Sequence, residues 1–162
     1  MKKLLVFLLL GCLLCGCGAR ETMETVADEL DEPSKPVMRE IYVDLPGEAA
    51  APVMEGEGSR YYICEDYEIS IETFPSGDVK NTMEILSGYS PDDLTVMKTE
   101  QDGAERYDFV WAAEGETGER LGRAAILDDG NYLYTMSVLR DADKTEKSQV
   151  VWRSVFESFT LT

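Results

Sequence analysis

The sequence contains no histidine. This excludes Ser-His-Asp and Cys-His catalysis, zinc sites that use histidine, and the usual general base. Gly-x-Ser-x-Gly and Ser-x-x-Lys motifs are also absent, and Gly56-Glu57-Gly58 is not followed by the residues of a phosphate-binding loop. The sequence therefore predicts no catalytic residue, no metal site and no cofactor, and we expect a protein that is not an enzyme.

Basic residues are scarce, with 15 Lys and Arg against 32 Asp and Glu, which gives a formal net charge of −17. Binding to nucleic acid depends on clustered Lys and Arg, so nucleic acid is not an expected partner. Direct adsorption to anionic lipid needs the same basic residues. An acidic surface keeps a domain soluble, and it can also attract cations or a basic partner.

No apolar run reaches the ~20 residues that a membrane-spanning helix needs. The longest run, residues 4–14, follows Lys2 and Lys3 and has the length of a signal-peptide core, ~7–15 residues. It ends in Leu14-Cys15-Gly16-Cys17, which resembles the lipobox of bacterial lipoproteins, with Cys15 where Ala or Ser is commoner.

The lipobox resemblance implies a signal peptide at 1–16, diacylglycerol on Cys17, and a lipid-anchored protein on the extracytoplasmic face of a bacterial cell membrane. The membrane, reached through this lipid, is then one partner. The alternatives are an ordinary secretory peptide cleaved nearby, or an apolar segment that is retained as the anchor.

Cysteine is also scarce. Of four cysteines, two would leave with the signal peptide and Cys17 would be acylated, which leaves Cys64 alone. An intramolecular disulfide is then impossible, and the fold depends on its core. Cys64 lies on a predicted strand among acids that disfavour a thiolate, so we interpret it as structural rather than nucleophilic.

Residues 17–38 are predicted to be an acidic flexible tether that starts at the lipidated cysteine. The segment has few large apolar side chains, so ordering it would cost more free energy than burial returns. A short helix at 22–30 is the alternative. Residues 39–162 are then a single globular domain. The acids of the tether are Glu21, Glu24, Asp28, Glu29, Asp31 and Glu32.

The first part of this domain alternates apolar and polar residues, which predicts strands at 41–45, 51–55 and 61–73. The last strand carries Glu65 on its apolar face, which indicates a bulge or bend near Glu65-Asp66. A helix is predicted between Asp78 as N-cap and Gly88 as C-cap, with Val79, Met83 and Leu86 facing the core.

Four further strands follow, and Asp-Gly pairs in two of their connections are typical of tight hairpins. A capping box at 143–146 opens a last helix, which ends the predicted elements. We therefore predict an α+β fold with a central antiparallel meander sheet of about six strands packed by two helices, in the order β-β-β-α-β-β-β-β-α. The four strands are 94–100, 105–113, 119–127 and 132–139, and the core-facing residues of the last helix are Val151, Trp152, Val155, Phe156 and Phe159.

This order of elements resembles the PsbP-like and DcrB-like group of small α/β domains. The likeness covers roughly residues 40–162 and lies in Asn131-Tyr132-Leu133-Tyr134-Thr135-Met136-Ser137 followed by the closing Val155-Phe156-Glu157-Ser158-Phe159. Members include photosystem accessory proteins, a Ran-binding protein and envelope lipoproteins. The resemblance implies an accessory binding domain of the bacterial cell envelope, with an envelope protein as a candidate partner.

The candidate partner-binding residues are Tyr61, Tyr62 and Tyr89, which lie near predicted turns, where aromatic side chains can be exposed and anchor a partner. Core packing is the alternative for each. Two other functions remain open: a carbohydrate- or divalent-cation-binding surface module, and a small hydrolase that uses paired acids. The acid pairs are Glu65-Asp66-Glu68, Asp92-Asp93 and Asp128-Asp129, and a partial calcium-loop pattern begins at Asp141.

Overall fold

The computed structural model describes residues 35–115, 118–142 and 146–162, without the side chains of 146–149. Within these ranges, Pro36–Thr162 forms one compact unit. The signal peptide, the lipidated Cys17, the possible helix at 22–30 and the start of the capping box lie outside the described residues. None of the helices in the described ranges is long and apolar enough to cross a membrane.

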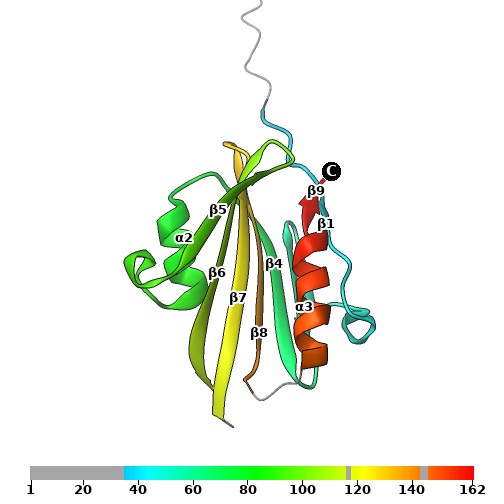
Figure 1. The fold of residues 1–162 in the computed structure, drawn as a ribbon. Helices are drawn as coiled ribbons and strands as arrows, with labels where there is room; N and C mark the ends of the chain where they lie inside the picture. Colours follow the sequence, from blue (N-terminus) through cyan, green and yellow to red (C-terminus); the bar gives the residue numbers. More distant parts are fainter. Residues whose placement is uncertain (1–34, 116–117, 143–145) are drawn as a thin grey trace, which may run out of the picture. The chain divides into compact units, whose positions relative to one another are not determined.

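A seven-stranded antiparallel sheet forms the centre of the unit (Figure 1), and its strand order is β2-β3-β4-β8-β7-β6-β5. The α+β class and the antiparallel meander are confirmed, with seven strands where about six were predicted. The strands are β2 (Met54–Gly56), β3 (Ser59–Ile63), β4 (Tyr67–Pro75), β5 (Val96–Gln101), β6 (Ala104–Gly115), β7 (Gly118–Asp128) and β8 (Tyr132–Asp141).

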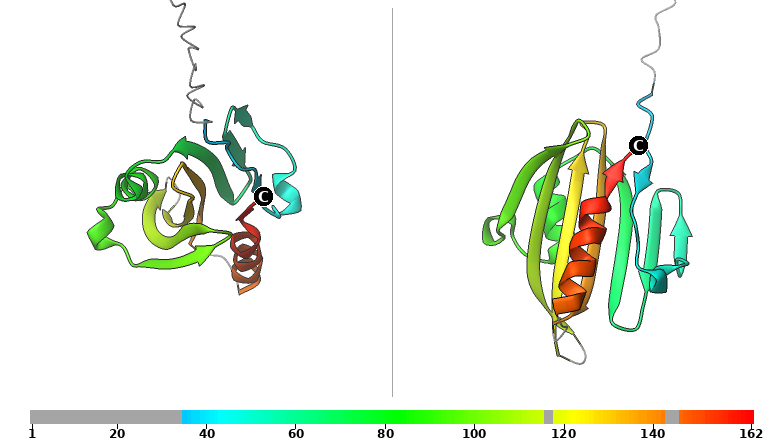
Figure 2. Two further views of the ribbon diagram at one scale, coloured as in Figure 1. Left: turned by 90° about the horizontal axis from the view of Figure 1, so that it is seen from above. Right: turned by 45° about the vertical axis from the view of Figure 1, so that its right-hand side comes forward.

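The two helices, α2 (Val79–Ser87) and α3 (Glu146–Ser158), cover opposite faces of this sheet. In Figure 2, right, α3 lies in front of the sheet and α2 behind it. Side chains alternate between the faces along each strand. On β8, Tyr134, Met136 and Val138 join the cluster under α3, whereas Leu133 joins the cluster under α2.

Helix α2 has the bounds that its local signals predict. The Asp78 carboxylate accepts a hydrogen bond from the Lys80 amide at 2.9 Å, which satisfies one free donor of the first turn. Gly88 ends the helix with a φ of 76°, a conformation that glycine adopts without a steric penalty. Met83 is buried on the sheet side.

Helix α3 buries Trp152, Val155 and Phe156, as predicted, but Val151 is 46% exposed. The predicted inward position of Val151 is therefore wrong, because the 3.6-residue period places it at the margin of the stripe that faces the sheet. The helix is not the last element: β9 (Thr160–Leu161) follows and pairs with β1 (Ile41–Tyr42) in a separate two-stranded sheet.

The predicted single strand at 61–73 is wrong, although the structure does bend at Glu65-Asp66, where a bulge or bend was predicted. The structure has a tight hairpin there: β3 ends at Ile63, β4 begins at Tyr67, and the Cys64 amide donates to the Tyr67 carbonyl at 2.9 Å. The reversal changes which side chains share a face. Tyr62 and Ile69 are paired residues that enter the core under α3.

The meander turns match the prediction. Asp102 and Gly103 join β5 to β6 with φ values of 55° and 74°, as the favoured two-residue hairpin turn requires. Between β7 and β8, the Asp129 carboxylate accepts hydrogen bonds from the amides of Asn131 (2.9 Å) and Tyr132 (2.7 Å). The predicted strand at 41–45 is shorter, because only Ile41 and Tyr42 have a partner strand.

Candidate functional site

A cavity of about 560 Å³ lies between α3 and strands β6–β8, and we call it the arginine cavity. Three of the chain's 15 basic residues line it, and its described lining contains no carboxylate. The lining residues are Val110, Trp111, Ala112, Leu121, Gly122, Arg123, Val138, Arg140, Trp152, Arg153 and Phe156.

Strand pairing explains why these residues meet. Val110 pairs with Arg123, and Arg123 pairs with Val138, so residues from three neighbouring strands share the face that carries α3. The helix does not cover all of this face: Val110 remains 60% exposed and Leu121 37%. The uncovered part is an apolar floor, and Trp152 and Phe156 of α3 form its wall.

Arg123 is held in place by an aromatic ring. Its guanidinium carbon lies 4.0 Å from the centre of the Phe156 ring, a favourable cation–π geometry, and its Nη2 lies 3.5 Å from Asp108 Oδ1. The planar guanidinium can stack on a ring and still direct hydrogen bonds outward. Arg123 is thus a partly buried and preorganised cation at the cavity wall.

Asp108 does not cancel the charge of Arg123, because it already pairs with buried Arg106. Arg106 donates to Asp108 from Nε at 2.6 Å and from Nη2 at 3.1 Å. Two guanidinium groups and one carboxylate therefore leave an excess positive charge beside the cavity. The planar fork of Arg106 makes this the stronger of the two pairs with Asp108.

Arg140 and Arg153 add to this positive charge from two other elements. Arg140 is partly buried on β8, and Arg153 is exposed on α3. Guanidinium groups above an apolar floor suit a carboxylate, sulfate or phosphate that carries an apolar part. Because the chain is strongly acidic elsewhere, this concentration of positive charge stands out as a candidate site.

The sequence-predicted Tyr61 lies on the opposite face, in a chain of polar contacts. Its hydroxyl donates to Glu68 Oε2 at 2.5 Å, and Arg120 Nη1 donates to Glu68 Oε1 at 2.9 Å. The bond to Glu68, followed by burial, raises the pKa of Tyr61 to about 12. The same bond is the largest cause that lowers the pKa of Glu68. Tyr61 and Glu68 line a cavity of about 390 Å³.

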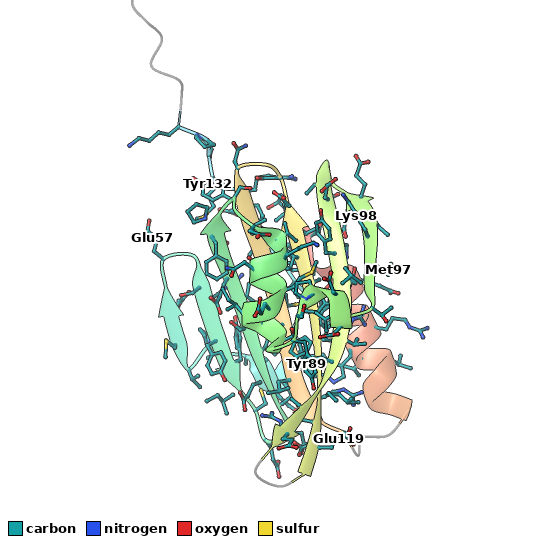
Figure 3. All side chains as sticks on the ribbon, turned by 90° about the vertical axis from the view of Figure 1, so that its left-hand side faces the viewer. Glu57, Tyr89, Met97, Lys98, Glu119 and Tyr132 are labelled. Carbon is teal, nitrogen blue, oxygen red and sulfur yellow. The ribbon has the colours of Figure 1, made fainter. Side chains whose placement is uncertain are left out.

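Tyr62 is 5% exposed and packs in the core, so its predicted exposure is wrong. The hairpin after Ile63 turns it toward α3 and away from the face of Tyr61. Tyr89 is exposed beyond the end of α2 (Figure 3), and its hydroxyl donates to the Ala112 carbonyl at 2.9 Å. The three tyrosines therefore do not form one surface, and binding by Tyr61 and Tyr89 stays a prediction.

Some of the paired acids have local partners. Asp129 holds the β7–β8 turn and accepts a hydrogen bond from the Tyr134 hydroxyl at 3.0 Å. Asp92 and Asp93 lie in an exposed 3₁₀ turn at Pro91–Asp93. Across the described ranges, no three Cys, Asp or Glu residues gather into a group that could hold a metal ion. Most of the calcium-loop pattern after Asp141 lies outside these ranges.

Sequence reasoning missed the arginine cavity because its cations are far apart in the chain and lie in no motif. Arg123 and Arg140 stand at strand positions where the alternation otherwise places apolar side chains, such as Leu121 and Ala125 on β7 and Met136 and Val138 on β8. The signal in the sequence was a charged residue at a strand position that alternation assigns to the apolar face. It identifies an exposed or functional position only once the strand pairing is known.

No protein-family model and no curated protein matches the sequence. A crystal structure of a protein from Bacteroides thetaiotaomicron, at 1.50 Å resolution, is similar, with a TM-score of 0.50 and 13% sequence identity. The match covers 75% of this chain and 45% of that one, so the chain spans less than half the length of the Bacteroides protein. At this identity the likeness shows a shared fold alone.

Proposed function

We propose that this chain is a non-enzymatic binding domain that takes an anionic ligand with an apolar part into the arginine cavity. The supporting observation is the set of three guanidinium groups, from Arg123, Arg140 and Arg153, over the apolar floor of β6 and β7. A guanidinium group can pair with an oxyanion through two N–H groups of its planar fork, and the apolar floor can contact the apolar part of the ligand.

The charge distribution favours selective binding at this cavity. A net charge of −17 repels anions from most of the surface, so the arginine cavity is where an anion gains attraction. Arg123 is already held between Phe156 and Asp108, so little side-chain entropy is lost when a ligand binds it.

The proposed location is the extracytoplasmic face of a bacterial cell membrane, with the lipid on Cys17 as anchor. The lipobox resemblance supports the anchor, and the PsbP-like and DcrB-like resemblance supports an accessory role in the envelope. An envelope protein or a small molecule could carry the anionic group. Replacing Cys17 by Ser should move the protein from the membrane fraction to the soluble fraction, and continued retention would contradict the anchor.

Calorimetric titration with phenyl phosphate, with benzyl alcohol as the neutral comparison, tests the ligand chemistry. We expect binding of phenyl phosphate alone, weakened at least fivefold by Arg153→Gln. Arg153 is exposed on α3, so this change should leave the fold intact. Arg60→Gln is the matched control, because Arg60 lies outside the arginine cavity. Equal affinities in the two variants, or no binding at all, would contradict the proposal.

A further inference from the structure

A second cavity, of about 450 Å³, adjoins the arginine cavity, because Arg140 and Trp152 line both. The two differ in chemistry. The second cavity contains two carboxylates, from Glu48 and Asp66, where the arginine cavity has none among its described lining residues. Its lining residues are Pro46, Gly47, Glu48, Asp66, Tyr67, Arg140, Val151 and Trp152.

Tyr67 gives this cavity an unused polar group. The residue is only 7% exposed, and its buried hydroxyl makes no hydrogen bond within the described part of the chain. Burial raises the pKa of Tyr67, and the nearby Cys64 thiol and Glu48 carboxylate raise it further. Such hydroxyls are rare, because burial without a partner costs free energy.

The ring of Tyr67 cannot easily turn to find a partner. It meets the Trp152 ring edge to face, with ring centres 4.8 Å apart and planes at 80°. Tyr67, a lining residue of the cavity, is therefore held in position, as expected of a residue that hydrogen-bonds to a ligand. The residue that fixes it, Trp152, also forms part of the arginine cavity.

The polar groups of the second cavity select the kind of ligand. The carboxylates of Glu48 and Asp66 can accept hydrogen bonds and repel a second anion, whereas a hydrocarbon chain there would remove water from the Glu48 carboxylate without replacing its hydrogen bonds. A ligand that carries several hydroxyls can donate to the carboxylates and also bond to Tyr67 and Arg140. An indole beside such polar groups also suits the apolar face of a sugar ring.

We propose that the two cavities together bind an acidic oligosaccharide, with its charged unit in the arginine cavity and a neighbouring sugar unit at Tyr67 in the second cavity. This inference rests on the proposed function, since it names the ligand class of the same site. Cavities of these volumes are in the range that holds small ligands, and their shared residues allow one molecule to reach both.

The test is calorimetric titration of the full chain in detergent with acidic oligosaccharides: fragments of polygalacturonate, alginate, chondroitin sulfate and heparin. Galactose oligomers provide the neutral comparison, and a tri-glutamate peptide provides the same charge without sugar hydroxyls. We expect at least one acidic oligosaccharide to bind at least tenfold more tightly than both comparison ligands.

Two variants separate the cavities. Tyr67→Phe should weaken the oligosaccharide at least fivefold and leave phenyl phosphate binding unchanged, whereas Arg153→Gln should weaken both. Tyr42→Phe, at an exposed tyrosine outside both cavities, is the control. A melting temperature of Tyr67→Phe at or above that of the parent shows that the fold is intact, and Glu48→Gln is the second variant if it is not.

Three results would overturn the inference. One is equal binding of tri-glutamate, which would indicate an acidic peptide as the ligand. Another is an oligosaccharide affinity that neither Tyr67→Phe nor Glu48→Gln changes. The third is binding of phenyl phosphate but of no acidic oligosaccharide, which would leave the proposed function intact. Absence of phenyl phosphate binding would instead remove the proposed function itself.

Discussion

Arg106 of β6 donates from Nη2 to the carbonyl oxygen of Phe156, 2.9 Å away, in the last turn of α3. Its Nη1 donates to the Phe159 carbonyl at 3.1 Å. The end of a helix leaves carbonyl groups without partners and carries partial negative charge, so a buried guanidinium there satisfies both needs. This contact fastens α3 to the sheet beside the arginine cavity.

Arg106→Met should destabilise the protein by about 3–5 kcal/mol, the usual cost of breaking a buried ion pair. Within the described residues, the change leaves the buried Asp108 paired with the more distant Arg123 alone, and it removes a donor from the carbonyls at the end of α3. Urea unfolding measures the loss. Lys80→Met is the control, because the Lys80–Asp92 pair is 3.9 Å long and exposed, and such pairs contribute about 0–1 kcal/mol. Equal effects would contradict this account.

Gly122→Ala should destabilise the protein by about 1–3 kcal/mol through overpacking. Gly122 is on β7, and the ring of Trp111 from the neighbouring β6 lies directly over it. A Cβ at position 122 would overlap this ring. Trp111 also packs against Phe109, with ring centres 5.7 Å apart, so its ring has little room to move.

Gly47→Ala is the matched control for this prediction, since nothing lies within 4 Å of a Cβ built there and its φ is not positive. Thermal unfolding of the two variants compares them directly. A Gly122→Ala protein as stable as the Gly47→Ala protein would show that Trp111 can move aside at no cost.

Tyr61→Phe should reduce the dependence of the free energy of unfolding on pH, at both high and low pH. At high pH, the unfolded chain releases the Tyr61 proton near its ordinary pKa of 10.0, whereas the folded chain holds it to about 12. Stability from this bond is complete below pH 10 and is lost as the pH rises toward 12.

At low pH, the lowered pKa of Glu68 acts in the opposite sense. The stabilisation that the Glu68 carboxylate provides is present above its ordinary pKa of 4.5. It is lost as the pH falls through the lower pKa of the folded state. Tyr61→Phe weakens both effects because the Tyr61–Glu68 bond is the main cause of each shift. Urea unfolding across the pH range, with the exposed Tyr42→Phe as control, should show this difference only for Tyr61→Phe.

Tyr67→Phe should leave the ligand-free protein as stable as the parent, or stabilise it by about 1 kcal/mol. The change removes a buried hydroxyl that has no hydrogen-bond partner among the described residues, and with it the cost of keeping that group from water. Chemical unfolding without ligand measures this. A loss of more than about 1 kcal/mol would show that the hydroxyl has a stabilising partner in the folded chain.

The sequence by itself determined the elements whose signals are local. Asp78 and Gly88 bound α2 because a side-chain cap and a positive φ depend on residues next to the helix. Asp102 and Gly103 fixed the β5–β6 hairpin in the same way. These signals act within a few residues, so the meander and both helices could be predicted without knowing what they pack against.

Only the tertiary structure decided which side chains lie on each face of the sheet and which residues form the candidate site. The hairpin after Ile63 contains no glycine or proline, the residues that usually indicate a turn. It reverses the chain direction, and Tyr62 rather than Tyr61 enters the core under α3. The arginine cavity needs β7, β8 and α3 side by side, because Arg123, Arg140 and Arg153 come from three elements. A one-residue shift in pairing moves a strand's side chains to the other face, and pairing depends on contacts distant in sequence.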